Sequence, residues 1–266
     1  MNLIAFNLKI IEYEENKEVE YRFYDNPINS SSHIDNDYEE EGYIEKEKFV
    51  PGSYDYVVDM IRSNYESHRR TKQAIYSHAR SNTWEWFVTY TFNPSKIDSS
   101  DYSKVYRSIS NHLHNIRKRI CLDMKYIVVP EYHLDGSKFH FHALMANIDG
   151  LSMVDSGKRN KGKIIYNVNN YKLGFTTAIR IGKDESARTA NYISKYITKN
   201  LTYVTKNRQR YLISQNLNKP IITDYLLSLE EFNNLKESLK EKTTSAKVVV
   251  LDGSYQNRIE YMNLKF

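Results

Sequence analysis

The 266-residue sequence predicts an α+β fold in which helices flank a central antiparallel sheet. Segments with the two-residue alternation of strands interleave with segments of helical periodicity. The clearest pair of strands, Lys125–His133 and Lys138–Ala146, flanks an Asp135-Gly136 turn. A turn this tight joins antiparallel strands, which argues against a doubly wound parallel sheet.

The first half of the chain supplies elements on both sides of an acidic segment. Residues 2–24 alternate apolar and polar side chains and predict one or two strands, whereas residues 25–48 are acidic and rich in Ser and Asn, as in a linker. A helix is expected from about Tyr54 to Ala79. Trp84–Phe92, rich in aromatic and β-branched residues, predicts a strand, and Asp101–Arg119 has the spacing of an amphipathic helix.

The second half continues the alternation after the hairpin. The polar, basic residues 151–172 predict an exposed loop, Phe175–Ile181 a strand and Ser186–Lys199 a helix. The tail adds a strand at Arg210–Ser214, a helix from about Ser228 and a last strand at Lys247–Leu251. We therefore expect three parts: an acidic N-terminal extension with a helix (1–75), a core (76–205), and a C-terminal strand–helix segment packed on the core (206–266).

Charge is distributed unevenly. Residues 1–60 contain 15 acidic and 5 basic side chains, so with an overall net charge of +5 the rest of the chain carries +15. Such a basic part suits a polyanionic partner, and the 23 tyrosines suit stacking on bases, although a solvated basic surface has the same composition. A single cysteine, with no signal-peptide pattern and no long apolar run, predicts a cytoplasmic protein without a membrane partner.

Two His-x-His patterns differ in their context. His112 and His114 lie in a predicted helix, where residues two apart point about 200° apart and cannot easily share one ion. His140 and His142 lie on a predicted strand, where residues two apart share a face. The strand pair is therefore the candidate metal site, and a polar sheet face with two solvated histidines is the alternative.

Counting back from the expected turn identifies a carboxylate partner. If Asp135-Gly136 is a two-residue turn, Glu131 pairs directly with His140 and shares its face with His142. One carboxylate and two imidazoles suit Mg²⁺ or Mn²⁺. His133 is a rival ligand, and a bulge near Pro130 would shift the register.

A second candidate group lies on the predicted helix near its C-terminal end. Tyr192 and Tyr196 are four residues apart on one face, Arg188 extends their stripe, and Lys195 and Lys199 form a parallel one. A phenol with a pKa near 10 needs nearby positive charge or a metal to act as a nucleophile at pH 7. An ordinary amphipathic helix whose tyrosines cover a sheet edge has the same pattern.

Together these segments resemble the HUH endonucleases, in particular the rolling-circle replication initiator (Rep) proteins of plasmids and single-stranded DNA phages. The resemblance rests on an aromatic/Thr strand, FVTYTF; a His-hydrophobic-His strand, FHFHALM; and a helix with YISKYITK, in the family's order across Phe87–Leu201. It implies an HUH/RRM-like sheet with the metal site on its face and the tyrosine helix packed against that face. Thr89 and Thr91 have no expected role beyond forming the strand.

The resemblance also implies a metal-dependent DNA endonuclease and strand transferase. Glu131, His140 and His142 would hold Mg²⁺ or Mn²⁺, which polarises the scissile phosphate. Tyr192 or Tyr196, beside Lys195 and Lys199, would attack and leave a 5′-phosphotyrosine and a free 3′-OH. The order in which the tyrosines act stays open.

The implied partner is single-stranded DNA at a plasmid or phage replication origin in the bacterial cytoplasm, with a host polymerase extending the 3′-OH. No phosphate-binding Gly-x-x-x-x-Gly-Lys-[Ser/Thr] loop occurs, so we expect no bound nucleotide and a dependence on a host helicase. A relaxase, a single-strand transposase and a non-catalytic nucleic-acid-binding module are the alternatives. The expected DNA contacts are Arg69, Arg70, Lys72, Arg80, Lys158, Arg159, Lys161, Lys163 and Arg188.

Overall fold

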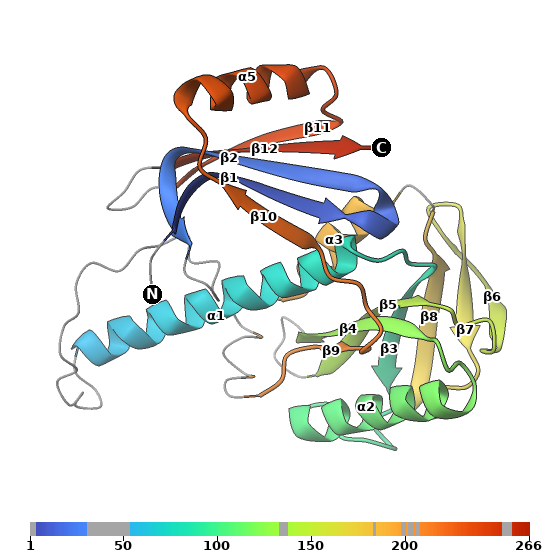
Figure 1. Cartoon of the computed structure of the whole chain (residues 1–266). Helices are drawn as coiled ribbons and strands as arrows, with labels where there is room; N and C mark the ends of the chain where they lie inside the picture. The colour runs from blue at the N-terminus through green and yellow to red at the C-terminus, as the bar shows by residue number, and fades with distance from the viewer. Residues whose placement is uncertain are drawn as a thin grey trace. The chain divides into compact units, whose positions relative to one another are not determined.

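The computed structural model describes residues 4–30, 54–132, 138–182, 185–197, 201, 205, 208–251 and 257–266. The chain forms two compact units, one made of residues 49–218 and the other of residues 1–48 with 219–266 (Figure 1). Each unit has its own antiparallel sheet, and the first contains every candidate site residue. The predicted α+β class with a central antiparallel sheet and flanking helices is confirmed.

The larger unit is built on a seven-stranded sheet in the order β6-β7-β8-β3-β5-β4-β9. β3 and β5 lie at its centre and pair with each other, so any side chain that both strands present to one face has neighbours on two sides. The strands are β3 (Trp86–Phe92), β4 (Lys125–Tyr132), β5 (Phe139–Ala146), β6 (Met153–Asn160), β7 (Lys163–Val168), β8 (Gly174–Arg180) and β9 (Leu212–Ile213).

One face of this sheet is covered by α2 (Tyr102–Arg119). Asp101 caps the helix by accepting hydrogen bonds from the backbone N–H groups of Ser103 and Lys104, which satisfies donors that a helix start leaves unpaired. The helix buries an apolar stripe made of Tyr102, Val105, Ile109, Leu113 and Ile116. Alternate residues of β3, including Tyr90, are buried on this side, where Tyr90 contacts His112 of α2. That face is therefore core.

The opposite face carries α1 (Tyr54–Arg80) and α3 (Ser186–Ser194). Figure 1 shows α1 and α2 on opposite sides of β4 and β5. α3 contacts both α1 and β5. Phe87, the neighbour of the buried Val88 on β3, points to this side and contacts Tyr192 of α3. The alternation of one strand thus separates a core face from a face that carries the candidate chemistry.

The smaller unit has a five-stranded sheet in the order β10-β1-β2-β12-β11. Its α5 begins with a capping box between Ser228 and Glu231, and Phe232 and Leu239 of α5 pack on Leu8 and Phe23 of the sheet. Its elements are β1 (Ile4–Tyr13), a 3₁₀ turn (Glu14–Asn16), β2 (Glu18–Ser30), β10 (Ile221–Tyr225), α5 (Leu229–Lys240), β11 (Ser245–Leu251) and β12 (Asn257–Lys265).

One sequence expectation about the larger unit is wrong. Residues 151–172, expected as a loop, form the β6–β7 hairpin, in which Asn160 pairs with Lys163. The two residues between them, Lys161 and Gly162, have φ values of 48° and 80°, the positive angles of a tight hairpin turn. The signal was missed because both strands are largely exposed and carry polar residues on both faces.

A second difference concerns the ends of elements and the boundaries between parts. α3 ends at Ser194, and residues 195–197 continue as turns with i→i−3 backbone hydrogen bonds, so the helix expected to reach residue 199 is shorter. The compact units divide near residues 48 and 218, whereas the expected boundaries at 75 and 205 do not coincide with these points. Residue 75 lies within the continuous helix α1. None of the described helices combines the length and apolarity needed to span a membrane.

Candidate active site

The expected pairing of β4 with β5 is observed. Glu131 of β4 lies directly opposite His140 of β5, and His142 lies opposite Val129, although the Asp135-Gly136 turn and His133 fall outside the described residues. Residues 131, 140 and 142 therefore share the face that α3 covers. The register counted from the sequence needed no bulge.

A carboxylate and an imidazole are in direct contact on this face. Glu131 Oε2 lies 2.7 Å from His142 Nε2. The His142 side chain is only 8% exposed, whereas that of Glu131 is 38% exposed. The contact therefore has a buried side formed by the imidazole and an open side at the carboxylate, from which an ion or a phosphate group has access.

Two threonines of β3 contact the other nitrogens of the histidine rings. Thr89 lies opposite His142 across the β3–β5 pair, and its Oγ1 is 3.0 Å from His142 Nδ1. Thr91 Oγ1 makes a longer contact, 3.4 Å, with His140 Nδ1. A hydroxyl can either donate to or accept from an imidazole nitrogen, so it holds the ring in place whichever nitrogen carries the proton. Sequence analysis assigned these threonines no such role.

The tyrosines meet the histidines on this face. The Tyr196 ring stacks on the His142 ring with 3.7 Å between centroids and 17° between planes. The hydroxyl of Tyr196 donates to that of Tyr192, 2.9 Å away. Phe87 contacts His142 and both tyrosine rings. The two candidate groups found separately in the sequence therefore form one cluster.

The two tyrosines differ in their surroundings. Tyr192 is 48% exposed. Tyr196 is half-buried, and its burial, followed by its hydrogen bond to Tyr192, raises the pKa of its phenol well above the ordinary value near 10. Because Tyr192 accepts the hydrogen bond, charge developing on its oxygen is stabilised by its neighbour. These differences make Tyr192 the better nucleophile of the pair.

The segment that carries Tyr196 is braced by α1. Nε2 of His68 lies 2.9 Å from the backbone oxygen of Ile197. Ile193 and Ile197 are buried in the core of the unit, so the turn after α3 is held from both sides. This anchoring keeps the Tyr196 ring over His142 even though α3 has already ended.

The predicted cations take different positions. Lys195 is exposed beside the tyrosines, and Lys199 lies outside the described residues. Nζ of Lys163 lies 2.8 Å from Oε2 of Glu185, just before α3, and Arg188 lies 3.8 Å from the same carboxylate. The Lys163 ammonium, followed by the Gly182 amide, lowers the pKa of Glu185. Lys163 therefore ties β7 to the start of the tyrosine helix.

The remaining expected DNA contacts lie on α1 and on the β6–β7 hairpin. Arg80 is only 2% exposed and donates to the Tyr76 hydroxyl, so its burial removes it as a DNA contact. Arg70 is exposed, and Arg69 and Lys72 are partly buried. Lys158, Arg159 and Lys161 are exposed on the hairpin, where Arg159 pairs with Asp155.

The donor set fits a divalent metal ion, although the ligands are not fully assembled. Within the described residues, no three His, Cys, Asp or Glu side chains are arranged as a ready metal site. Glu131 and His142 nevertheless touch, and His140 is the residue paired with Glu131. One carboxylate oxygen with two imidazole nitrogens is a set that Mg²⁺ or Mn²⁺ accepts alongside water and phosphate oxygens. Binding would require Nε2 of His142 to exchange its contact with Glu131 for the ion.

Comparison with known proteins points to the same segment. A family model for replication-associated proteins of the ORF2 type matches residues 85–201. Searches of curated proteins and of solved structures found no match. The matched segment runs from the residue before β3 to the residues that follow the tyrosines, so it contains the whole cluster. The match supports a replication initiator protein; it does not specify the chemistry.

Proposed function

We propose that this protein is an HUH-type endonuclease that nicks single-stranded DNA at a replication origin and so starts rolling-circle replication. The observation that carries the proposal is the stacking of Tyr196 on His142, whose other contacts are Glu131 and Thr89. Through the tyrosine pair, this places a nucleophile beside a candidate metal site. The cluster lies within the segment that resembles replication-associated proteins.

In the proposed reaction, the oxygen of Tyr192 attacks the phosphorus of one phosphodiester. A bond forms between phosphorus and the tyrosine oxygen, and the bond from phosphorus to the 3′ oxygen breaks. The phenol proton passes to solvent, which the 48% exposure of Tyr192 permits, and the leaving 3′ oxygen takes up a proton to become a 3′-OH. The 5′ end stays on the enzyme, and a host polymerase extends the 3′-OH.

The other side chains of the cluster bind and orient. Glu131, His140 and His142 would hold the divalent ion, which when bound supplies positive charge at the scissile phosphate. Thr89 and Thr91 fix the two imidazole rings from their Nδ1 side. The exposed Lys195 adds positive charge near the phenols. Tyr196 supports the first attack through its hydrogen bond and is available for a second attack that closes the displaced strand.

Covalent capture tests the proposal. The protein is incubated with single-stranded oligonucleotides from its own replicon, with Mn²⁺ or with EDTA, and the products are separated on a denaturing protein gel. We expect a heat-stable adduct that forms only with the metal and is absent from His142→Ala. Tyr192→Phe should abolish adduct formation, whereas Tyr196→Phe should slow the first nick and block strand closure.

The outcomes separate this proposal from its alternatives. Adduct formation by Tyr192→Phe but not by Tyr196→Phe would reverse the roles of the two tyrosines. Tight binding of DNA with no adduct from any origin sequence would overturn the nuclease proposal in favour of a binding module. An adduct with a transfer origin or a transposon end, but with no replication origin, would reassign the same chemistry to a relaxase or a transposase.

A further inference from the structure

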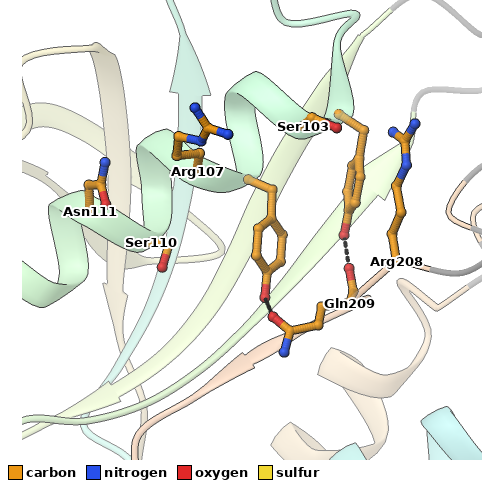
Figure 2. A pocket seen from close by; sticks show the side chains of 8 residues that line it. Ser103, Arg107, Ser110, Asn111, Arg208 and Gln209 are labelled. Carbon is orange, nitrogen blue, oxygen red and sulfur yellow. Dashed lines mark hydrogen bonds between the residues drawn. The ribbon is translucent and has the colours of Figure 1, made fainter.

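A pocket of about 340 Å³ lies beside α2, on the sheet face opposite the tyrosine cluster. One wall is the exposed flank of the helix, with Arg107 and Asn111, and the other is the segment that leads into β9, with Arg208 and Gln209. Figure 2 shows the two arginines standing on these two separate segments. The size is that of a site for a small ligand or for part of a larger one.

The pocket is positively charged. Arg107 and Arg208 are both exposed, and among the described residues neither side chain forms an ion pair or hydrogen bond. No acidic side chain lines the pocket. Two guanidinium groups on different segments, without a carboxylate between them, repel each other unless an anion binds. Planar guanidinium groups match the geometry of phosphate oxygens.

The pocket also presents aromatic rings held in fixed positions. Tyr102 donates a hydrogen bond to the backbone oxygen of Gln209, and Tyr106 donates to the side-chain oxygen of the same residue, 2.6 Å away; the dashed lines in Figure 2 mark both bonds. Burial raises the pKa of Tyr106 to about 12, so this phenol stays neutral and adds no negative charge. Rigid neutral rings beside cations are the usual surroundings of a nucleic-acid strand.

A row of rings connects this pocket with the end of the sheet that carries Glu131. Tyr102 contacts Phe139 with 5.0 Å between ring centroids, and Phe139 contacts Tyr132 with 4.6 Å. Tyr132 and Phe139 are paired and immediately follow and precede the Glu131–His140 pair. By strand alternation the two pairs face opposite sides of the sheet at the same end. A strand that leaves the tyrosine face around this end meets the arginine pocket next.

We propose that this pocket, which we call the α2 pocket and define by Tyr102, Tyr106, Arg107, Arg208 and Gln209, binds a phosphodiester of the same single-stranded DNA, away from the bond that is cut. The inference rests on the proposed function for the identity of the DNA. The pocket would hold the flanking strand while the opposite face carries out the chemistry, which lengthens the DNA footprint beyond the nick site.

The test measures how salt affects DNA binding. Fluorescence anisotropy with a long single-stranded oligonucleotide and with a short one spanning only the nick is recorded at several salt concentrations for the wild type and for Arg107→Gln/Arg208→Gln. Each phosphate contact on a single strand contributes about 0.7 to the slope of log K against log salt. We expect the slope for the long oligonucleotide to fall by about 0.7 if one phosphate is held and about 1.4 if two are, with no change for the short one.

Matched variants make the result specific. Lys219→Gln/Lys242→Gln removes the same charge from exposed residues of the other compact unit and should leave the slope unchanged. Arg107→Lys/Arg208→Lys keeps the charge and should keep most of the slope while weakening binding, because an ammonium cannot bind phosphate in two places at once. Inorganic phosphate and dTMP are titrated separately, since strong competition by either at millimolar concentration would point to a free nucleotide or phosphate site instead.

Two failures remain distinguishable. If the double glutamine variant has the wild-type slope with the long oligonucleotide, or if it weakens the long and the short oligonucleotide equally, the α2 pocket is not a flanking-strand site, whatever the outcome of adduct formation. If the wild type forms no adduct but the variant still loses slope, the pocket inference stands and the nicking proposal fails. Adduct formation on the short oligonucleotide should be the same in the wild type and in the variant.

Discussion

Replacing Thr89 with valine tests whether the hydroxyls of β3 organise the metal site. Valine keeps the β-branched shape that suits a central strand but removes the hydroxyl that lies 3.0 Å from Nδ1 of the buried His142. The ring then loses the contact that fixes its rotation. Loss of such a partner to a metal-binding histidine typically weakens metal binding 10- to 100-fold, or about 1.4 to 2.7 kcal/mol.

The assay is isothermal titration of Mn²⁺ into the protein without DNA, so that the readout does not depend on nicking. We expect Thr89→Val to bind Mn²⁺ about 10- to 100-fold more weakly and Thr89→Ser to restore most of the affinity. Thr91→Val should have a smaller effect because its contact with His140 is longer, at 3.4 Å. Thr177, which pairs with Thr89 from β8, supplies the control, and Thr177→Val should bind as the wild type does.

Equal Mn²⁺ affinity in Thr89→Val and the wild type would refute the reasoning. A loss of affinity that Thr89→Ser does not restore would assign the effect to packing instead of the hydroxyl. A melting temperature within a few degrees of the wild type is required for each variant, because an unfolded fraction also lowers the apparent affinity.

Three further predictions concern other parts of the same unit. Phe87→Ala removes the ring that contacts His142 and both tyrosines, so the rate of adduct formation should fall while Mn²⁺ affinity changes less than in Thr89→Val; equal losses in both would contradict this. Burial lowers the pKa of His112 to about 4, from an ordinary value near 6.5, so the unfolded chain binds this proton more readily than the folded one between those values. The free energy of unfolding should therefore fall as pH drops from about 6.5 to about 4, by up to about 3 kcal/mol; His112→Phe should flatten this dependence in denaturant titrations, while the same change at the exposed His114 should not. In Gly174→Ala the new Cβ would lie 2.0 Å from the backbone oxygen of Thr91, so β8 and β3 must separate and the melting temperature should drop by several degrees; an unchanged melting temperature would show that the strands yield easily.

Local pattern was sufficient to predict most of what positions the site. The pairing of Glu131 with His140 follows from counting across a tight turn, since strand geometry is regular and no bulge intervenes. Tyr192 follows from helical spacing on α3. Both inferences concern residues close in sequence, where the backbone period alone decides which side chains share a face.

The β6–β7 hairpin was missed for a different reason. Its strands are exposed on both faces, so they lack the apolar alternation by which a half-buried strand is recognised. Only the Lys161-Gly162 turn carried a signal, and the pairing that it permits depends on β7 joining β8 at the edge of a sheet already formed. β10 and β12 are similar, because their partners β1 and β2 lie near the other end of the chain.

The role of Thr89 and Thr91 shows most clearly what local pattern omits. Their alternation with buried residues on β3 was visible and correctly predicted a strand with two faces. That they contact the Nδ1 atoms of His142 and His140 depends on β3 lying beside β5, an order of strands that crosses α2 and β4 in the chain and that no short-range signal encodes. The sequence therefore located the groups able to do chemistry, whereas the groups that orient them became identifiable only once the sheet had placed residue 89 next to residue 142.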